Sequence, residues 1–266
     1  MRRLEGSTAL VTGGASGLGK AIAIRLKSEG ATVFISDIQA DLGREVAAGE
    51  GFTFLVQDVC SEAGWSETLG SVESRSGALH ILVNNAGILG SVENADPENT
   101  PLELWRKIFT VNVESVFLGC RAAIRAMRRT GGGSIINMSS VAGVLAVPSA
   151  VAYAASKAAV RSLTKSVAQY CAERKLKIRC NSVHPGDVMT PLWEKAAEGF
   201  ARARGMTAKE VIEHERSLSP MGDFPKPEDI AAAVAYLASA DARFVTGDGL
   251  IVDAGVVNCD TFHPES

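Results

Sequence analysis

The chain has 266 residues, of which 46% are hydrophobic and 21% charged, and its net charge is −3 at pH 7. This length fits one large α/β domain, and this share of apolar residues supplies a core without help from disulfides or metals. The sequence has no basic stripe and no run of about 18 apolar residues, so neither a nucleic-acid partner nor a membrane span is expected.

The cysteines favour a reducing compartment. Cys60, Cys120, Cys171, Cys180 and Cys259 are widely spaced, odd in number, and form no C-x-x-C pair. This pattern predicts free thiols rather than a disulfide framework or a zinc site, so no metal is expected. The two arginines near the N-terminus are not followed by an apolar segment, which argues against a signal peptide. We therefore expect a cytoplasmic protein.

Short β-branched segments alternate with longer helical patterns along the chain. Segments such as 9–11 and 80–83 are apolar throughout, which is typical of strands covered on both faces of a parallel sheet. The predicted strands are Thr8–Thr12, Thr32–Asp37, Phe52–Asp58, His80–Asn84, Ser134–Ser139, Lys177–His184 and Leu250–Asp253. The predicted helices are Leu18–Glu29, Asp41–Gly49, Glu62–Ser76, Leu102–Arg129, Ala150–Arg174 and Pro227–Ser239. This order predicts a single-domain α/β Rossmann fold over residues 1–266, a doubly wound parallel seven-stranded sheet with helices on both faces.

A glycine-rich turn, TGGASGLG at residues 12–19, follows the first predicted strand and precedes the first helix. Glycines permit close backbone approach, and free amides with the helix dipole favour an anionic pyrophosphate. A glycine-rich turn by itself is weak evidence, but its position after the first strand favours a dinucleotide site. The residues expected to bind the cofactor here are Gly13, Ser16, Gly17, Leu18 and Gly19.

Asp37 ends the second predicted strand, 24 residues after Gly13. A carboxylate there can accept hydrogen bonds from the adenosine ribose hydroxyls and would repel the 2′-phosphate of NADP. No arginine stands at Ser16 or Ile38 to receive that phosphate. NAD is therefore the predicted cofactor, and the alternative is that Asp37 only starts a turn.

Tyr153 and Lys157 lie four residues apart in a helical pattern. This separation spans about 6 Å of helix and places both side chains on one face. A nearby ammonium stabilises a phenolate, so we expect Lys157 to lower the pKa of Tyr153 below its usual value near ~10. Such pairs also occur by chance in helices, so this pattern needs other motifs beside it.

Other motifs follow in order along the chain. They are the glycine turn, Asn84-Asn85-Ala86-Gly87, Asn112, Ser139-Ser140, Tyr153 with Lys157, and Pro185-Gly186. With these motifs the chain resembles the short-chain dehydrogenase/reductase family over essentially its whole length. Residues 10–17, 114–120 and 134–138 look like those of bacterial hydroxysteroid and cyclic-alcohol dehydrogenases, although much of this is scaffold.

The resemblance implies a catalytic group of four residues. Tyr153 would be the acid/base, and Lys157 would hold the nicotinamide ribose and lower the tyrosine's pKa. Ser140, 13 residues before Tyr153, would hydrogen-bond the substrate oxygen. Asn112 would anchor a water that links Lys157 to solvent. The protein would supply orientation and proton transfer, while the nicotinamide carries the hydride.

The resemblance also implies further cofactor contacts and an assembly. Asp58 and Val59 would contact adenine, Asn85, Ala86 and Gly87 would line the cofactor, and Pro185, Gly186, Val188 and Thr190 would hold the nicotinamide carboxamide. A homotetramer is expected, packed through the helices predicted at 102–129 and 150–174. The tail beyond Asp253, including residues 259–264, is expected to reach a neighbouring subunit.

The segment between Thr190 and Pro220 interrupts the alternation of strands and helices. It has no strand pattern, only two short helical patterns around Gly199 and Gly205. Such an insertion predicts a lid over the site at residues 190–220, with a surface helical hairpin as the alternative. The predicted substrate pocket is mostly apolar, or else these residues pack in the core or at a subunit contact. Its candidates are Ile88, Leu89, Val141, Val147, Met189, Trp193 and Phe200.

The predicted function is an NAD-dependent oxidoreductase that interconverts a secondary alcohol and a ketone on a hydrophobic substrate, such as a cyclic, aromatic or steroid alcohol. The alternative is a 3-oxoacyl-thioester reductase using NADPH, which usually has a basic residue where Ser16 or Asp37 stands. A hydrolase is disfavoured because no G-x-S-x-G is present, and a metal enzyme because no H-E-x-x-H occurs. A non-catalytic nucleotide sensor would have lost part of the catalytic group. His184 is expected to pack behind the cofactor loop, and Asp187 adds a charge near the nicotinamide.

Overall fold

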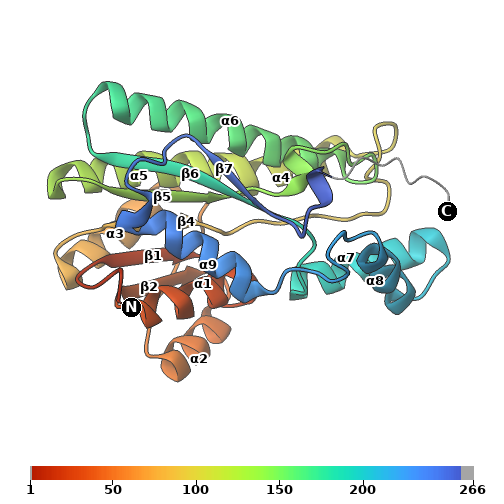
Figure 1. Cartoon of the computed structure of the whole chain (residues 1–266), viewed down its shortest axis with the longest axis horizontal. Helices are drawn as coiled ribbons and strands as arrows, with labels where there is room; N and C mark the ends of the chain where they lie inside the picture. Colours follow the sequence, from red (N-terminus) through yellow and green to blue (C-terminus); the bar gives the residue numbers. More distant parts are fainter. Residues whose placement is uncertain (1, 259–266) are drawn as a thin grey trace.

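Seven parallel strands form one sheet in the order β3-β2-β1-β4-β5-β6-β7. Figure 1 labels the strands from β2 to β7 in this order across the sheet. The computed structural model describes residues 2–258. The strands are β1 (Thr8–Thr12), β2 (Thr32–Asp37), β3 (Thr53–Val56), β4 (Ile81–Asn84), β5 (Gly133–Met138), β6 (Ile178–Pro185) and β7 (Gly249–Val252). The predicted doubly wound, seven-stranded α/β fold is thereby confirmed.

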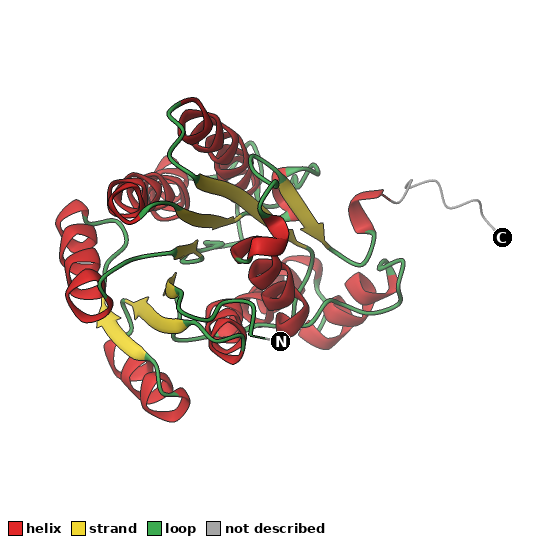
Figure 2. Ribbon diagram, turned by 60° about the vertical axis from the view of Figure 1, so that its left-hand side comes forward, coloured by secondary structure: helices red, strands yellow, loops and turns green. Residues whose placement is uncertain are grey.

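Helices cover both faces of this sheet, as Figure 2 shows. One face packs against α1, α2 and α9, and the other against α3, α5 and α6. The α-helices are α1 (Gly17–Ser28), α2 (Ala40–Glu50), α3 (Glu62–Ser76), α4 (Leu102–Phe109), α5 (Ser115–Thr130), α6 (Val151–Glu173), α7 (Pro191–Arg204), α8 (Ala208–Ser217) and α9 (Pro227–Ala238).

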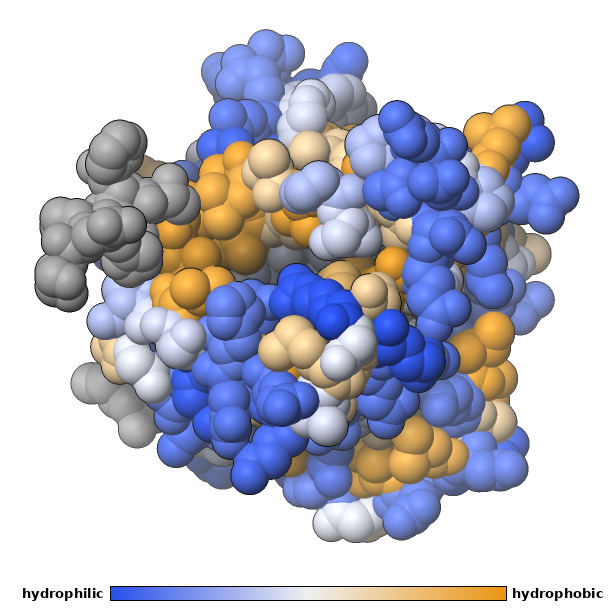
Figure 3. All heavy atoms as spheres, turned by 90° about the vertical axis from the view of Figure 1, so that its right-hand side faces the viewer, coloured by the Kyte–Doolittle hydropathy of each residue, from blue (hydrophilic) through white to orange (hydrophobic). Residues whose placement is uncertain are grey.

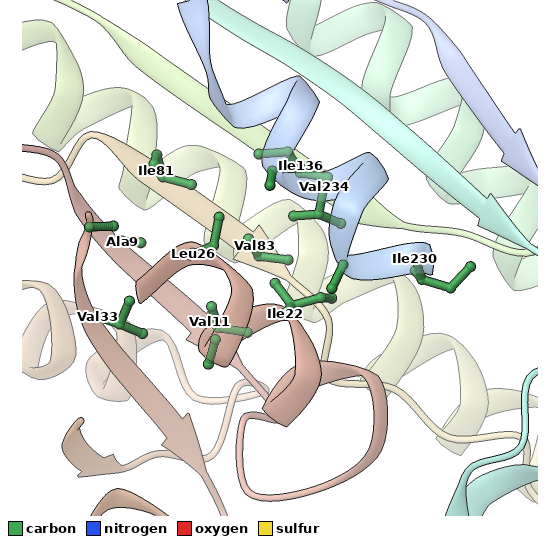
Figure 4. Close-up of a cluster of buried hydrophobic side chains, with 14 of the residues drawn as sticks. Ala9, Val11, Ile22, Leu26, Val33, Ile81, Val83, Ile136, Ile230 and Val234 are labelled. Carbon is green, nitrogen blue, oxygen red and sulfur yellow. The ribbon is translucent and has the colours of Figure 1, made fainter. Parts of the chain in front are cut away.

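The central strand β1 explains why the strand segments are apolar throughout. Ala9 and Val11 point into one core cluster, while Leu10 between them points into the other, and all three are fully buried. Successive side chains of a strand face opposite sides of the sheet, so a strand covered on both faces must be apolar at every position. Figure 4 shows the first cluster, in which Ile22 of α1 and Val234 of α9 meet over the strands.

The helix predicted at 102–129 is present as one unbroken helical run, but the helix type changes within it. It divides into α4, a π-helical turn at Thr110–Glu114, and α5. Asn112 lies within this turn and is 1% exposed. Its amide bonds the backbone of Ile88 on another segment. Such π-turns commonly occur at functional sites, and apolar periodicity does not distinguish them from an ordinary helix.

The segment 190–220 forms α7 and α8 beyond the carboxyl end of β6, at the right of Figure 1. Two short helices are present as predicted, but their positions differ from the patterns around Gly199 and Gly205. Gly199 lies inside α7, where a Cβ would stand 2.3 Å from Val92 Cγ2. Gly205 ends α7 with a φ of 66°, a left-handed conformation that favours glycine.

The expectations on the cysteines, the C-terminal tail and a membrane span can be compared with the structure only within residues 2–258. Cys60, Cys120, Cys171 and Cys180 are free thiols, whereas Cys259 and the predicted tail contact at 259–264 lie outside the described residues. No helix between residues 2 and 258 combines the length and apolar character needed to cross a membrane.

Candidate active site

The site lies where the sheet order reverses direction. β1 neighbours both β2 and β4, so the loops after β1 and β4 diverge at the carboxyl edge of the sheet. In doubly wound sheets this divergence leaves a crevice for ligands. A cavity opens here, and most of the predicted cofactor residues line it: Gly13, Ser16, Gly17, Leu18, Gly19, Asp37, Asp58, Val59, Asn85, Ala86, Gly87, Tyr153, Lys157 and Thr190.

The glycine turn is packed closely against the loop after β4. Asn85 Nδ2 donates to the carbonyl oxygens of Thr12 (2.9 Å) and Gly13 (3.1 Å). A Cβ on Gly13 would stand 3.0 Å from Ala86 Cα, and one on Gly19 would stand 2.0 Å from Gly13 O. These glycines therefore let the turn fold tightly, so that the N-terminus of α1 faces the cavity.

Gly19→Ala is expected to disturb this turn, because the new Cβ would collide with the Gly13 carbonyl. Backbone has to move to relieve such a clash, so we expect the affinity for NAD to fall about 10-fold or more. Isothermal titration with NAD measures the change. Gly70→Ala in α3 is the matched control, because a Cβ there meets nothing within 4 Å. Equal NAD affinity in both variants would contradict the assigned role of the turn.

The adenosine end of the cavity contains Asp37, which is 8% exposed. Its carboxylate accepts hydrogen bonds from Ala15 N (3.2 Å) and Gln39 N (3.0 Å). These two backbone bonds fix the carboxylate at the rim of the cavity. Among the described lining residues Lys157 is the one cation, and it belongs to the predicted catalytic group.

Gln57 also lines this cavity, although no sequence motif singles it out. It is 3% exposed, and neither polar atom of its carboxamide has a hydrogen-bond partner among the described residues. Buried amides without partners are uncommon in folded proteins. Its position directly before Asp58 was the available signal, but burial without a partner is a property of the folded chain.

The acid/base end begins at the first turn of α6. Tyr153 lies there, and Lys157 Nζ is 5.5 Å from the centroid of the tyrosine ring. Lys157 Nζ donates to Met138 O (3.0 Å), and Ser139 Oγ donates to Lys157 O (2.8 Å). The end of β5 therefore holds this helix so that tyrosine and lysine face the cavity together.

Burial alters the proton affinities of this pair. It raises the pKa of Tyr153 to about 12, with the nearby charge of Asp187 acting in the same direction and a hydrogen bond with Ser140 opposing it. Burial also lowers the pKa of Lys157 to about 8. The predicted lowering of the tyrosine pKa is therefore wrong for the chain by itself, because desolvation of the phenolate by burial is the largest influence on that pKa.

Ser140 follows β5 and is held from two sides. Its Oγ accepts from Ala142 N (3.1 Å), and its carbonyl oxygen lies 3.2 Å from His184 Nδ1. His184 is fully buried, and its Nε2 lies 2.9 Å from Ser182 Oγ. Burial lowers the pKa of His184. His184 thus holds the backbone of Ser140 in place and lines neither cavity.

Asn112 reaches the same group from the π-turn. Its Oδ1 accepts from Ile88 N (2.8 Å), and its Nδ2 donates to Ile88 O (2.8 Å) and Ser156 Oγ (3.0 Å). A Cβ on Gly87 would stand 3.2 Å from Asn112 Oδ1 and 3.4 Å from Lys157 Nζ. Asn112 and Lys157 therefore approach Gly87 together, although Asn112 does not line the cavity.

A second cavity of about 350 Å³ adjoins the first, and both Tyr153 and Ser140 line it. This volume suits a small organic molecule. Its predicted lining residues present here are Leu89, Val141, Val147, Trp193 and Phe200. Figure 3 views the face that bears α7 and α8, where apolar side chains lie beside a hollow with hydrophilic side chains around it.

Two groups of predicted residues lie elsewhere than expected. Pro185, Gly186 and Val188 line the second cavity rather than the first. Ile88 lines the first cavity, and Met189 lines neither, so its place in the substrate pocket is corrected. Within residues 2–258 no three His, Cys, Asp or Glu side chains gather where a metal ion would fit.

Comparison with known proteins defines the class of this site. A family model described as Enoyl-(Acyl carrier protein) reductase matches residues 13–257. The NADP-dependent (R)-specific alcohol dehydrogenase of Lentilactobacillus kefiri is 41% identical, covering 95% of this chain and 97% of its own. The 3-beta-hydroxysteroid dehydrogenase of Comamonas testosteroni is 41% identical, covering 96% and 97%. The aldohexose dehydrogenase of Thermoplasma acidophilum is 34% identical, with a TM-score of 0.89 over 99% of this chain and 98% of its own.

The chain belongs to the short-chain dehydrogenase/reductase family, whose members use a nicotinamide cofactor. The cyclopentanol dehydrogenase of Comamonas sp. is another relative, 39% identical over 96% of this chain and 98% of its own.

Proposed function

We propose that the protein is an NAD-dependent oxidoreductase that interconverts a secondary alcohol and a ketone on an apolar, ring-bearing substrate. The observation that carries this proposal is that Tyr153 lines both cavities. One cavity has the glycine turn and helix N-terminus that suit a dinucleotide, and the other is an apolar pocket of small-molecule size. A proton donor shared by both is what carbonyl reduction beside a hydride carrier requires.

The residues of the first cavity fit a nicotinamide dinucleotide. Its glycine turn would hold the pyrophosphate, Asp37 the adenosine ribose, and Lys157 the nicotinamide ribose. When bound, the cofactor supplies or accepts the hydride. The close packing at Gly13 and Gly19, which leaves no room for a Cβ, supports the fit of a dinucleotide at this turn.

The chain's own residues would donate and accept the proton that accompanies hydride transfer. The Tyr153 phenol gives its proton to the carbonyl oxygen in reduction and takes one from the alcohol in oxidation. The Ser140 hydroxyl holds the same oxygen, and the buried Lys157 ammonium stabilises the phenolate. Asn112, fixed by Ile88 and Ser156, would place a water on the far side of Lys157.

The preference for NAD rests on Asp37. The relative from Lentilactobacillus kefiri is NADP-dependent by name, so family membership does not decide the cofactor. A fixed carboxylate at the ribose position repels a 2′-phosphate, and the adenosine end has no lining cation among the described residues. The same feature weighs against the alternative, an NADPH-dependent 3-oxoacyl-thioester reductase.

Combining Asp37→Ala with Ile38→Arg is expected to shift the preference toward NADP. Ile38 lines the cavity and is 69% exposed, so an arginine there can reach the phosphate. Removing the repulsion and adding one charged hydrogen bond is expected to change the NAD/NADP ratio of kcat/KM by about 10- to 100-fold. Leu42→Arg adds the same charge on α2 outside the cavity lining and should leave the ratio unchanged. A wild-type preference for NADP would refute the assignment.

The names of the relatives support an alcohol as substrate. They include a 3-beta-hydroxysteroid dehydrogenase and a cyclopentanol dehydrogenase, both acting on ring-borne hydroxyl groups. Incubation with NAD or NADP and a panel of cyclohexanol, aryl ethanols, hydroxysteroids, sugar alcohols and hydroxy acids tests the proposal. NAD-dependent turnover of a ring-borne alcohol is expected. Faster turnover of a sugar alcohol or hydroxy acid would contradict the apolar pocket, and faster reduction of a 3-oxoacyl thioester with NADPH would favour the alternative.

We further propose that α7 and α8 form the lid of the substrate pocket and that the protein is a cytoplasmic homotetramer of single-domain subunits. The lid is supported by Trp193, Phe200 and Glu215, which line the second cavity from these helices. The assembly is supported by family resemblance and by exposed aromatic side chains on the two long helices, Phe117 on α5 and Tyr170 on α6.

A further inference from the structure

Asp187 stands in the second cavity, and none of residues 2–258 forms a hydrogen bond with its side chain. It follows the Pro185-Gly186 turn at the end of β6 and lines the cavity together with Tyr153. No group within residues 2–258 donates a hydrogen bond to its carboxylate, and neither of its oxygens is among the fully enclosed unpaired atoms. The carboxylate is therefore half-buried and open to the space where substrate would bind.

The other charged groups that line this cavity are already engaged. Arg204 of α7 pairs with Glu215 of α8 through Nη1 and Oε1 at 2.9 Å, and its guanidinium lies 5.3 Å from the centroid of the Phe200 ring. Burial raises the pKa of Asp187 to about 6, and the charge of Glu215 adds to that effect. Asp187 is thus a desolvated acid that remains mostly ionised at neutral pH, and no cation among the described residues pairs with it.

A substrate that fills the cavity removes the remaining water from Asp187. A carboxylate that loses water without gaining a donor is costly, so a purely apolar alcohol is penalised there. A substrate that offers a second hydrogen-bond donor removes this penalty. Sites built to bond a hydroxyl group discriminate strongly against analogues that lack it.

We propose that Asp187 is a specificity-determining residue that accepts a hydrogen bond from a second hydroxyl group of the substrate. The inference rests on the proposed function and narrows its substrate class to diols and hydroxyketones in which an apolar ring or chain separates the two oxygens. Tyr153 and Ser140 hold the reacting oxygen, and Asp187 holds the other.

The charges around the site favour a neutral hydroxyl group over an ionised one. An anionic substituent would meet the carboxylates of Asp187 and Glu215, which line the same cavity. An ammonium substituent would lose much more hydration than a hydroxyl group on entering this cavity, and the Lys157 ammonium lies beside Tyr153 at the reacting end. A neutral donor meets neither cost, and its bond to a carboxylate is stronger than one to a neutral acceptor.

The test compares cyclohexanol with the 1,2-, 1,3- and 1,4-cyclohexanediols as substrates with NAD. The wild-type enzyme is expected to prefer at least one diol. Asp187→Leu is expected to lower kcat/KM for that diol by about 10- to 100-fold, mainly through KM, and to leave cyclohexanol unchanged or improved. Asp187→Asn keeps an acceptor oxygen without the charge and should fall between the two. Glu194→Gln, an exposed acid of α7 outside both cavity linings, is the matched control.

The possible outcomes distinguish a failure of the inference on Asp187 from a failure of the proposed function on which it rests. If cyclohexanol is oxidised and the diol-to-cyclohexanol ratio is the same in Asp187→Leu as in the wild type, the role of Asp187 is refuted while the proposed function stands. A wild-type preference for aminocyclohexanols over the diols would equally refute the neutral hydroxyl partner. If the wild type turns over neither alcohols nor diols with either cofactor, both proposals fall. Thermal unfolding checks the variants, and Asp187→Asn carries the comparison if the leucine variant does not fold.

Discussion

Tyr153→Phe is expected to lower kcat/KM in both directions by about 100- to 10,000-fold, the usual contribution of a positioned general acid/base. Phenylalanine keeps the ring that packs beside Lys157 and removes the phenol hydroxyl, the proposed acid/base group of a residue that lines both cavities. The affinity for NAD should change little, because the glycine turn and Asp37 are untouched. Initial rates with the best alcohol, together with NAD titration, separate chemistry from binding.

Tyr170→Phe is the matched control for this variant. Tyr170 lies on the same helix and is 40% exposed, outside both cavity linings, so its hydroxyl should be dispensable. The pH profile adds a second readout. Because burial raises the pKa of Tyr153 to about 12, alcohol oxidation, which needs the phenolate, should accelerate as pH rises, and ketone reduction should not. Undiminished activity in Tyr153→Phe, or an oxidation rate that falls with rising pH, would contradict the assignment.

The fold follows from patterns that are local in sequence. Ala9, Leu10 and Val11 are apolar in succession, as a strand buried on both faces requires, and β1 lies at the centre of the sheet. The glycine turn and Asp37 are likewise fixed by the ends of two adjacent parallel strands. Chain order and strand ends were therefore enough to predict which loops meet at the cavity.

Features that depend on three-dimensional surroundings were not predictable in this way. The π-turn around Asn112 forms where a buried amide bonds the backbone at Ile88, a contact between residues 24 positions apart. The pKa of Tyr153 depends mainly on the burial of its hydroxyl, which the four-residue spacing from Lys157 does not reveal. The unpaired carboxamide of Gln57 becomes notable only once its burial is known.

Lys157→Met is expected to remove activity and to stabilise the fold. Lys157 is 6% exposed, and its Nζ donates to Met138 O. Burial lowers its pKa from 10.5 to about 8, so below pH 8 the folded chain bears the cost of a desolvated ammonium. A methionine of similar length removes that charge and loses one hydrogen bond, for a net gain of about 1–2 kcal/mol in the free energy of unfolding at pH 7.

The pH dependence of this gain identifies its cause. Between the folded pKa near 8 and the unfolded value of 10.5, the unfolded chain binds the proton that the folded chain has released, so wild-type stability rises with pH there. The advantage of Lys157→Met should therefore be full below pH 8 and shrink toward pH 10.5. Chemical unfolding at several pH values measures it, with Lys165→Met, an exposed lysine of α6, as control. This cost in stability is consistent with the roles proposed for Lys157 toward the phenolate and the nicotinamide ribose. A variant that is less stable at pH 7, or whose advantage persists at high pH, would contradict this cost.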